Sequence, residues 1–315
     1  MYELFRLLVL AYLWVVAVVF SIYLVIYFIT SVINQQSKIC YHLKLIFLYY
    51  TFTMAAIIIL PVMLVRPRNV DNCSLICWVV RKLPSSIDIT WEIRRSEILA
   101  QPEGSVLVVN HQSELDLLDP NKVTFTITMP RPGSVSTKVN VRELISRSTL
   151  IVKKEILYLV PFGQLSWLAG VAFVNRSNSA QANKVLDDCE KLLVNKNIKI
   201  WVYPEGTRSY GKGMLQFKRG AFKIAINAQA PVVPIVISPY YFMDYKNNTM
   251  SKGHGIISVL DPIPTKGWTM DKCDEFAENV RQLMMAEYEK LGKELTVMQQ
   301  DTDWLNVKRP IRLVK

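Results

Sequence analysis

The chain has 315 residues, which is enough for one large domain or two small ones. Its net charge of +11 arises from 37 Lys and Arg residues against 26 Asp and Glu residues. The basic residues are spread out without a nucleic-acid-binding motif, which argues against a nucleic-acid partner and favours an anionic membrane surface and a phosphorylated substrate. The five cysteines are scattered, which argues against a disulfide framework or a zinc site and indicates a reducing compartment.

Two long apolar runs near the N-terminus predict a helical hairpin embedded in a membrane. No charged residue occurs between positions 7 and 33 or between positions 45 and 65, and each run exceeds the ~20 residues that cross a hydrocarbon core. A cleaved signal peptide is the competing interpretation of the first run, and a buried core helix that of the second. We expect residues 1–68 to form the hairpin, fully spanning or partly re-entrant, and residues 69–315 to form a second domain.

The charges that flank the two runs predict the orientation of the hairpin. The basic residues after the second run are Arg66, Arg68, Arg81, Lys82, Arg94 and Arg95. The connection between the runs holds only Lys38, Lys44 and His42. By the positive-inside rule, the second domain therefore faces the cytosol. Sequons at Asn72, Asn175 and Asn247 should then stay unmodified.

After the hairpin, short β-branched runs alternate with helical patterns, which is typical of an α/β domain. Strands are expected at 87–99, 105–109, 170–176, 198–203 and 231–237, and helices at 182–193, 217–228 and 271–295. The turn at 101–104 should join the first two strands as a pair, and His254, between two glycines, should lie in a hairpin. Residues 121–147 have no chemical interpretation.

The segment 110–116, Asn-His-Gln-Ser-Glu-Leu-Asp, directly follows the buried strand 105–109 and is the best candidate for chemistry. The imidazole of His111 can take a proton near neutral pH, and the carboxylate of Asp116 can fix its tautomer. On a regular helix these two side chains would lie ~140° apart, so the pair requires a turn between strand and helix. A buried polar loop without a catalytic role has the same appearance.

Two further strand ends carry arginines. The motif Glu205-Gly206-Thr207-Arg208 follows the strand 198–203, and Arg176 ends the strand 170–176. Glycine permits close backbone approach, and arginine matches phosphate oxygens bidentately. Each motif alone is better explained as a surface turn with a solvated arginine. Together, two arginines at adjacent strand ends opposite a histidine base predict a phosphate clamp beside a proton acceptor.

Four segments, in order and spacing, resemble the conserved blocks of glycerolipid acyltransferases. They are Asn-His-x-x-x-x-Asp at 110–116, Gly-x-x-Phe-x-x-Arg at 170–176, Tyr-Pro-Glu-Gly-Thr-Arg-Ser at 203–209 and Val-Pro-Ile-Val at 233–236. The resemblance is closest to the lysophosphatidic acid acyltransferases of the eukaryotic endoplasmic reticulum and covers roughly residues 87 to 265. Residues 121–147 depart from it, because this region is longer than expected.

The resemblance implies a mixed sheet flanked by helices behind the hairpin, in a protein of the endoplasmic reticulum membrane. It implies transfer of a fatty acyl group from acyl-CoA to the sn-2 hydroxyl of lysophosphatidic acid, with no metal and no cofactor beyond acyl-CoA as co-substrate. His111 would be the general base and Asp116 its orienting partner. The phosphate would be held by Glu205, Gly206, Thr207, Arg208, Arg176 and Lys154, with Glu205 orienting Arg208 through a salt bridge. The acyl-CoA side would be shaped by Val233, Pro234, Ile235 and Val236.

Three alternatives remain open from the sequence. The acceptor could instead be glycerol-3-phosphate or another lysophospholipid. The chain could be a non-catalytic membrane protein that binds lipid or acyl-CoA, although such a protein has no need of the pair His111 and Asp116. A thioester hydrolase is the third alternative, and it would release CoA without an acceptor.

Overall fold

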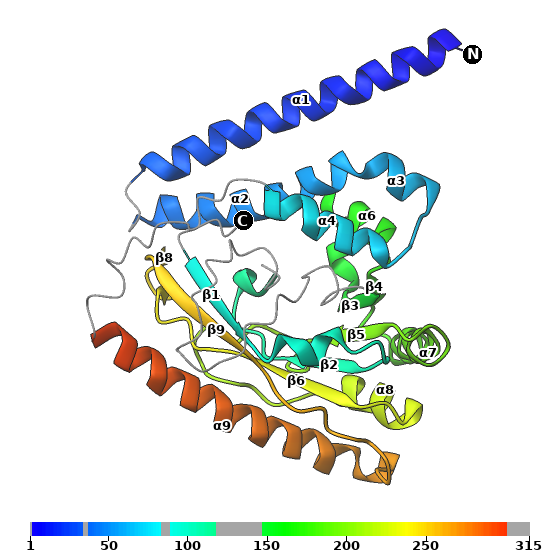
Figure 1. Cartoon of the computed structure of the whole chain (residues 1–315), viewed down its shortest axis with the longest axis vertical. Helices are drawn as coiled ribbons and strands as arrows, with labels where there is room; N and C mark the ends of the chain where they lie inside the picture. The colour runs from blue at the N-terminus through cyan, green and yellow to red at the C-terminus, as the bar shows by residue number, and fades with distance from the viewer. Residues whose placement is uncertain (1, 34–36, 83–88, 118–146, 301–315) are drawn as a thin grey trace, which may run out of the picture.

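A computed structural model describes residues 2–33, 37–82, 89–117 and 147–300, which form a seven-stranded sheet with helices on both faces (Figure 1). The strand order is β1-β9-β6-β2-β5-β3-β4. The strands span Ile89–Arg94 (β1), Val106–Val109 (β2), Ser148–Lys153 (β3), Ala172–Val174 (β4), Lys199–Val202 (β5), Val232–Ile237 (β6) and Gly253–Val259 (β9). Neighbouring strands are parallel except β6 and β9, so the predicted mixed sheet is confirmed.

The helices divide between the two faces of the sheet. On one face lie α1 (Tyr2–Val32), α2 (Lys38–Ile58), α3 (Leu60–Val65), α4 (Asp71–Lys82) and α6 (Phe162–Leu168). On the other lie α7 (Ser179–Lys196), α8 (Gly220–Ala228) and α9 (Cys273–Gln300). Short 3-10 helices span Ser96–Ala100, Glu114–Leu117, Lys154–Tyr158 and Met270–Lys272, and a small hairpin joins β7 (Met243–Asp244) to β8 (Thr249–Met250).

The period-2 geometry of the central strands produces a core on each face. In β2, Leu107 and Val109 face the cluster beneath α2, whereas Val106 and Val108 face the cluster formed with α7, α8 and α9. Side chains of a strand alternate between faces, so a strand buried on both faces is apolar throughout, as in parallel sheets. This burial explains why the apolar runs at 105–109 and 231–237 predict strands correctly.

The two N-terminal helices pack against each other, but only one also packs against the sheet. The Tyr50 hydroxyl donates to the Val19 carbonyl at 2.9 Å, and the rings of Tyr23 and Phe47 lie 5.0 Å apart. Helix α1 leaves most of its apolar side chains exposed, whereas α2 buries one face against the domain. Both helices are long and apolar enough to cross a membrane, which is consistent with membrane association.

The second predicted helix, 45–65, differs from the structure at both ends. The Ser37 hydroxyl caps the amide of Cys40, so α2 begins at Lys38. Lys44 consequently lies inside the helix, 1% exposed, rather than in the connection. The helix stops at Ile58 because Pro61 cannot donate a backbone hydrogen bond, and α3 follows as a separate turn.

Two predicted strand pairings are wrong. β1 does not pair with β2, because β9 and β6 lie between them and β1 pairs in parallel with β9. His254 does not lie in a hairpin but in β9, opposite Thr90, with its ring nitrogen Nδ1 2.8 Å from the Thr90 hydroxyl. Of the uninterpreted region 121–147, all but Arg147 lies outside the described residues.

Candidate active site

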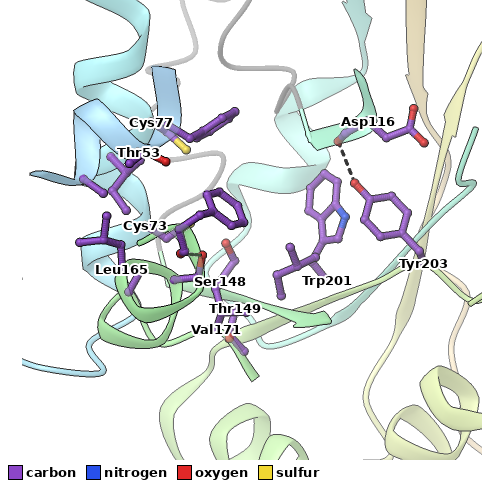
Figure 2. A pocket seen from close by; sticks show the side chains of 17 residues that line it. Thr53, Cys73, Cys77, Asp116, Ser148, Thr149, Leu165, Val171, Trp201 and Tyr203 are labelled. Atoms are coloured by element: carbon purple, nitrogen blue, oxygen red, sulfur yellow. Dashed lines mark hydrogen bonds between the residues drawn. The ribbon is translucent and has the colours of Figure 1, made fainter. Parts of the chain in front are cut away.

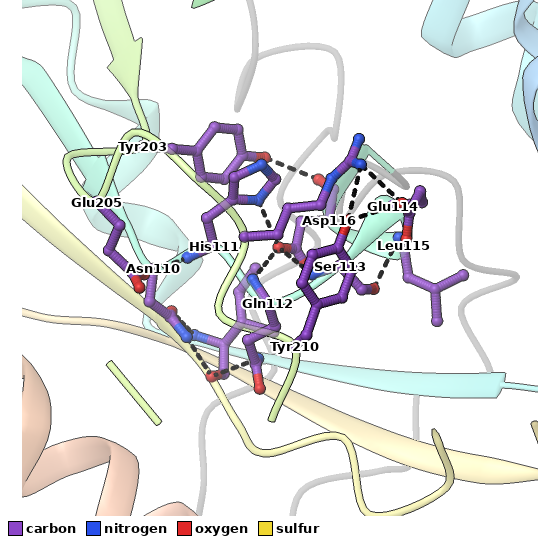
Figure 3. Close-up of polar contacts among 12 residues, drawn as sticks. Asn110, His111, Gln112, Ser113, Glu114, Leu115, Asp116, Tyr203, Glu205 and Tyr210 are labelled. Carbon is purple, nitrogen blue, oxygen red and sulfur yellow. Dashed lines mark hydrogen bonds and ion pairs between the residues drawn. The ribbon is translucent and has the colours of Figure 1, made fainter. Parts of the chain in front are cut away.

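The carboxyl ends of β2, β5, β6, β3 and β4 meet at one edge of the sheet because these strands are mutually parallel. Open α/β sheets bind ligands at this edge. His111 and Asp116 follow β2 here, with Nδ1 of His111 2.7 Å from Oδ2 of Asp116 (Figure 3). The predicted pair therefore forms.

An irregular turn brings the two side chains together. The carboxylate oxygen Oδ2 of Asp116 also accepts the backbone N–H groups of Gln112 and Ser113, the latter at 3.0 Å. The backbone therefore turns around the Asp116 carboxylate. This is the irregular turn that the five-residue spacing between His111 and Asp116 requires. Oδ1 accepts the hydroxyl of the buried Tyr240 at 2.7 Å. Burial, and then the Asp116 charge, raise the pKa of Tyr240 well above its usual range, so this hydroxyl remains a donor.

The other ring nitrogen of His111 is left available. Because a carboxylate only accepts, the contact with Asp116 puts the proton on Nδ1 and leaves Nε2 as an acceptor. No hydrogen bond to Nε2 occurs within the described residues. The ring of Tyr203, at the end of β5, stacks on the imidazole with 4.2 Å between centroids, and its hydroxyl donates to the Asp116 carbonyl at 2.8 Å. The imidazole of His111 is therefore held in one orientation, by Asp116 at Nδ1 and by the stacked ring of Tyr203.

Side-chain amides fix the loop to the neighbouring strand. Asn110 exchanges two hydrogen bonds with the backbone of Ile237, at 3.0 and 2.7 Å, and so extends the pairing of β2 and β6. The Gln112 amide donates to the Ser238 carbonyl at 2.9 Å and accepts from the Tyr288 hydroxyl of α9 at 3.1 Å. The loop is held on both sides, which favours a preorganised base.

Glu205 does not form the predicted salt bridge with Arg208. Its carboxylate accepts the backbone N–H of His111 at 2.6 Å and of Leu215 at 2.8 Å. The side chain is buried, and desolvation raises the pKa of Glu205 to about 7 despite the opposing effect of the two N–H donors. Glu205 therefore ties together three loops rather than orienting an arginine.

The partner of Arg208 is Glu114, two residues before Asp116. Nη1 of Arg208 lies 2.6 Å from Oε1 of Glu114 and 3.2 Å from the Tyr210 hydroxyl. The two charged side chains are 26% and 15% exposed, so the pair lies at the edge of the site, where a ligand phosphate can reach it. A carboxylate in contact with the guanidinium competes with any phosphate that binds there.

Two further cations converge on the Gly206 loop. The Arg176 guanidinium donates to the Gly206 carbonyl. Gly206 has φ +68°, a conformation that favours glycine, and a Cβ there would lie 3.0 Å from the Lys218 ammonium, so the absent side chain leaves room for this lysine. Arg176 and Arg208 do meet at one loop, but their strands are not adjacent, because β3 lies between β4 and β5. Thr207 is exposed on the same loop, and half-buried Lys154 follows β3 at the same sheet edge.

An apolar cavity of about 150 Å³ opens beside the pair (Figure 2). Its walls are side chains of α2, α4, α6, β3 and β5, and it reaches Asp116 and Tyr203. Val233, Pro234, Ile235 and Val236 do not line it, because all four are buried within β6. The apolar space next to the base therefore lies beneath the N-terminal helices, away from the predicted residues of β6.

Comparison with known proteins identifies the family of the chain. The sequence profile of the Acyltransferase family matches residues 90–238. The chain is 33% identical over 253 residues to 1-acyl-sn-glycerol-3-phosphate acyltransferase alpha of Homo sapiens, covering 80% of this chain and 82% of that protein. The chain belongs to the 1-acyl-sn-glycerol-3-phosphate acyltransferase family.

Further comparisons agree with this family. The beta enzyme of Homo sapiens is 33% identical over 77% of this chain and 81% of its own length. The crystal structure of the lysophosphatidic acid acyltransferase PlsC from Thermotoga maritima has a TM-score of 0.54 at 20% identity, covering 80% of this chain and 97% of that one. The predicted acyltransferase class and fold are confirmed, and the protein is an acyltransferase of lipid biosynthesis.

Sequence reasoning about this acyltransferase missed residues that contact the predicted ones. Tyr203 stands in the third block, directly after a strand that ends at the site, so its position was a usable signal. No sequence signal pointed to Glu114 or Tyr240, because each contacts a residue that follows a different strand. Among the described residues, no group of three or more His, Cys, Asp or Glu is placed to hold a metal ion.

Proposed function

We propose that this acyltransferase uses acyl-CoA to acylate the sn-2 hydroxyl of lysophosphatidic acid, giving phosphatidic acid. The observation that carries the mechanism is the contact between His111 and Asp116, which leaves Nε2 of His111 free to accept a proton. The acceptor is inferred from the names of the relatives, which are 1-acyl-sn-glycerol-3-phosphate acyltransferases.

In this reaction, the substrate hydroxyl gives its proton to Nε2 of His111 while its oxygen attacks the thioester carbonyl carbon. A carbon–oxygen bond forms and the carbon–sulfur bond breaks. The CoA thiolate leaves, and the imidazolium returns the proton to it. Asp116 stabilises the imidazolium, since its Oδ2 lies 2.7 Å from Nδ1. Proton transfer of this kind contributes roughly 10²–10⁴-fold to the rate.

The acceptor phosphate binds at the Gly206 loop. Arg208, Arg176 and Lys218 supply positive charge there, and guanidinium groups suit phosphate oxygens. Glycine at position 206 leaves room for the Lys218 ammonium beside the backbone, where its charge can reach the phosphate. This arrangement sets the phosphate beside the base, as a short glycerol phosphate requires.

An acyl chain occupies the apolar cavity beneath α2. Its walls include Phe52 and Ala56 of α2, so the cavity adjoins the helices that associate with the membrane. An insoluble chain can then pass between bilayer and site without crossing water.

The test is transfer of labelled oleoyl groups from oleoyl-CoA to lysophosphatidic acid by membranes carrying the wild type, His111→Ala or His42→Ala. We expect labelled phosphatidic acid from the wild type and from His42→Ala, whose side chain is exposed on α2, and none from His111→Ala. Full activity of His111→Ala would refute the mechanism. Acylation of glycerol-3-phosphate or another lysophospholipid in place of lysophosphatidic acid would refute the acceptor and leave the mechanism intact.

We further propose that the domain faces the cytosol from the endoplasmic reticulum membrane, because basic residues follow α2. The sequon at Asn247 is exposed between β7 and β8, so a lumenal domain would be modified there. Treatment with an endoglycosidase should leave the mobility of the protein on gels unchanged. A mobility shift that Asn247→Gln abolishes would place the domain in the lumen.

A further inference from the structure

The turn that leads into α6 carries an exposed apolar tip. Tyr158, Leu159 and Val160 are adjacent in the chain and are 67%, 52% and 78% exposed. Single exposed apolar residues are common on proteins, whereas several together mark a surface that contacts a membrane or another protein. This tip, residues 158–160, is therefore a candidate contact surface.

The tip lies beside a helix that associates with the membrane. The N–H of Gly163 in α6 donates to the Leu159 carbonyl at 2.7 Å, which holds the tip against the start of this helix. Phe162 of α6 packs edge-on against Tyr49 of α2, with 5.7 Å between the ring centroids. Figure 1 shows α6 on the same side of the sheet as α1 and α2. A bilayer that reaches α2 at this point therefore also reaches the tip.

The other end of α6 is joined to the end of the N-terminal apolar segment. Leu64 and Val65 of α3 are exposed. Just after them, the backbone N–H of Arg68 donates to the Leu168 carbonyl of α6 at 2.9 Å. The Arg68 guanidinium lies 5.2 Å from the centroid of the exposed Trp167 ring. Apolar surface is therefore exposed at both ends of α6.

The aromatic and charged residues around α6 suit a lipid headgroup region. Trp167 and Tyr158 stand at opposite ends of the helix, and tryptophan and tyrosine favour the boundary between headgroups and hydrocarbon. Arg68 lies beside one of these rings, and Lys153 and Glu155 are exposed just before the other. Basic side chains at this depth bind anionic headgroups. This combination favours a bilayer over a protein partner.

We propose that the tip 158–160 inserts into the bilayer and forms a second membrane contact, outside the helical hairpin. The contact involves the wall of the apolar cavity, because Phe162, Leu165 and Ser166 of α6 line that cavity. The bilayer then supports the α6 wall as well as the α2 wall. Removal of the apolar tip would leave the hairpin as anchor but would free the α6 side from the membrane surface.

The experiment places a fluorescent label at single positions of the full chain in liposomes of phosphatidylcholine and phosphatidylserine. The label is attached to cysteine in Val160→Cys of the tip, Leu13→Cys of α1 and Val194→Cys of α7, because all three native side chains are exposed. α7 lies on the opposite face of the sheet, so Val194→Cys is the matched control. Leu159→Cys carries the test if Val160→Cys does not fold. The unsubstituted chain, treated with the same reagent, gives the background from the native cysteines.

We expect the label at position 160 to emit at shorter wavelength than the label at position 194, and to be quenched several-fold less by aqueous iodide. Lipids that carry a nitroxide on their acyl chains should quench it, as they quench the label at position 13. Iodide quenching equal to that at position 194 would overturn the inference. Short-wavelength emission without quenching by the nitroxide lipids would overturn it too, because protein would then cover the tip. These readings need no substrate, so they are independent of the proposed acyl transfer.

Discussion

The phenol ring of Tyr203 lies nearly flat against the imidazole of His111, with 22° between the ring planes. This contact limits rotation of the imidazole about its side-chain bonds. The hydrogen bond between Nδ1 of His111 and Asp116 limits the same rotation. The orientation of Nε2 thus depends on one hydrogen bond, to Asp116, and on one stacked ring that comes from another strand end.

Replacing the stacked ring should therefore slow the chemical step more than it weakens substrate binding. For Tyr203→Leu we expect kcat to fall roughly 10- to 100-fold, because a misplaced base loses reactive geometry, and KM to change by less, because Tyr203 is one of many residues that line the cavity. Tyr203→Phe retains the stack and loses only the hydrogen bond to the Asp116 carbonyl, so its kcat should stay within about fivefold of the wild type. Equal losses in steady-state kinetics of the two variants would show that the hydroxyl, and not the stacking, matters.

The ion pair between Glu114 and Arg208 should weaken binding of a phosphate-bearing acceptor. Glu114→Gln keeps a hydrogen-bond acceptor for the guanidinium and removes the competing charge. We expect the KM for lysophosphatidic acid to fall by up to about fivefold at low salt, since the pair is partly exposed. Arg208→Ala should raise this KM roughly 10- to 100-fold. An increase in KM for Glu114→Gln would show that the carboxylate positions Arg208 for binding.

Ionisation of Glu205 should make the stability of the protein depend on pH. Its pKa in the folded state, about 7, lies above the ordinary value of 4.5, so between these values the folded protein binds more protons than the unfolded chain. The contribution of Glu205 to the free energy of unfolding is therefore present at low pH and decreases as pH rises through this range, by about 3 kcal/mol in total.

Glu205→Gln cannot ionise, which makes it the reference for this effect. The amide loses one of the two backbone hydrogen bonds, so the variant should unfold at a lower temperature than the wild type near pH 5. Thermal unfolding in detergent should show this gap narrowing towards pH 8. A gap that widens with pH would mean that the folded protein prefers the carboxylate.

Filling the cavity should change the preference for acyl-chain length. Ala56→Leu adds volume to the wall that α2 contributes to a cavity of about 150 Å³. We expect activity with long acyl-CoA to fall relative to short acyl-CoA, measured by competition between the two donors. Ala180→Leu, on the exposed surface of α7, provides the matched control. A uniform loss across chain lengths would argue against this cavity as the acyl site.

The sequence predicted the positions of strands and helices better than it predicted which strands pair with each other. The alternation in β1 identifies a strand, but its partner β9 lies more than 150 residues away, and local patterns cannot select it. The glycines around His254 suggested a turn, yet they mark close packing. A Cβ at Gly253 would meet the Phe242 ring at 2.1 Å, and one at Gly255 would meet the Trp91 ring at 2.5 Å.

The same division holds at the site. The pair His111 and Asp116 was predictable because both belong to one short turn, whose carboxylate binds its own backbone. The partner of Arg208 was not, because the closer acidic residue in sequence, Glu205, is buried and occupied by two backbone N–H groups. Burial therefore determines that Glu114, and not Glu205, pairs with Arg208. Burial depends on how separate strands assemble, which local sequence does not show.

Helix α2 supplies Phe52, Thr53 and Ala56 to the cavity wall, whereas α1 supplies none of the described lining residues. Removing α1 and removing α2 should therefore have different effects on the cavity. A chain truncated before Ser37 keeps every lining residue that the structure describes, and the apolar surface left exposed on α2 is the one to redesign for solubility. A chain truncated after α2 loses Phe52, Thr53 and Ala56 as well, so in a fragment of that length the proposed acyl site would be open on this side.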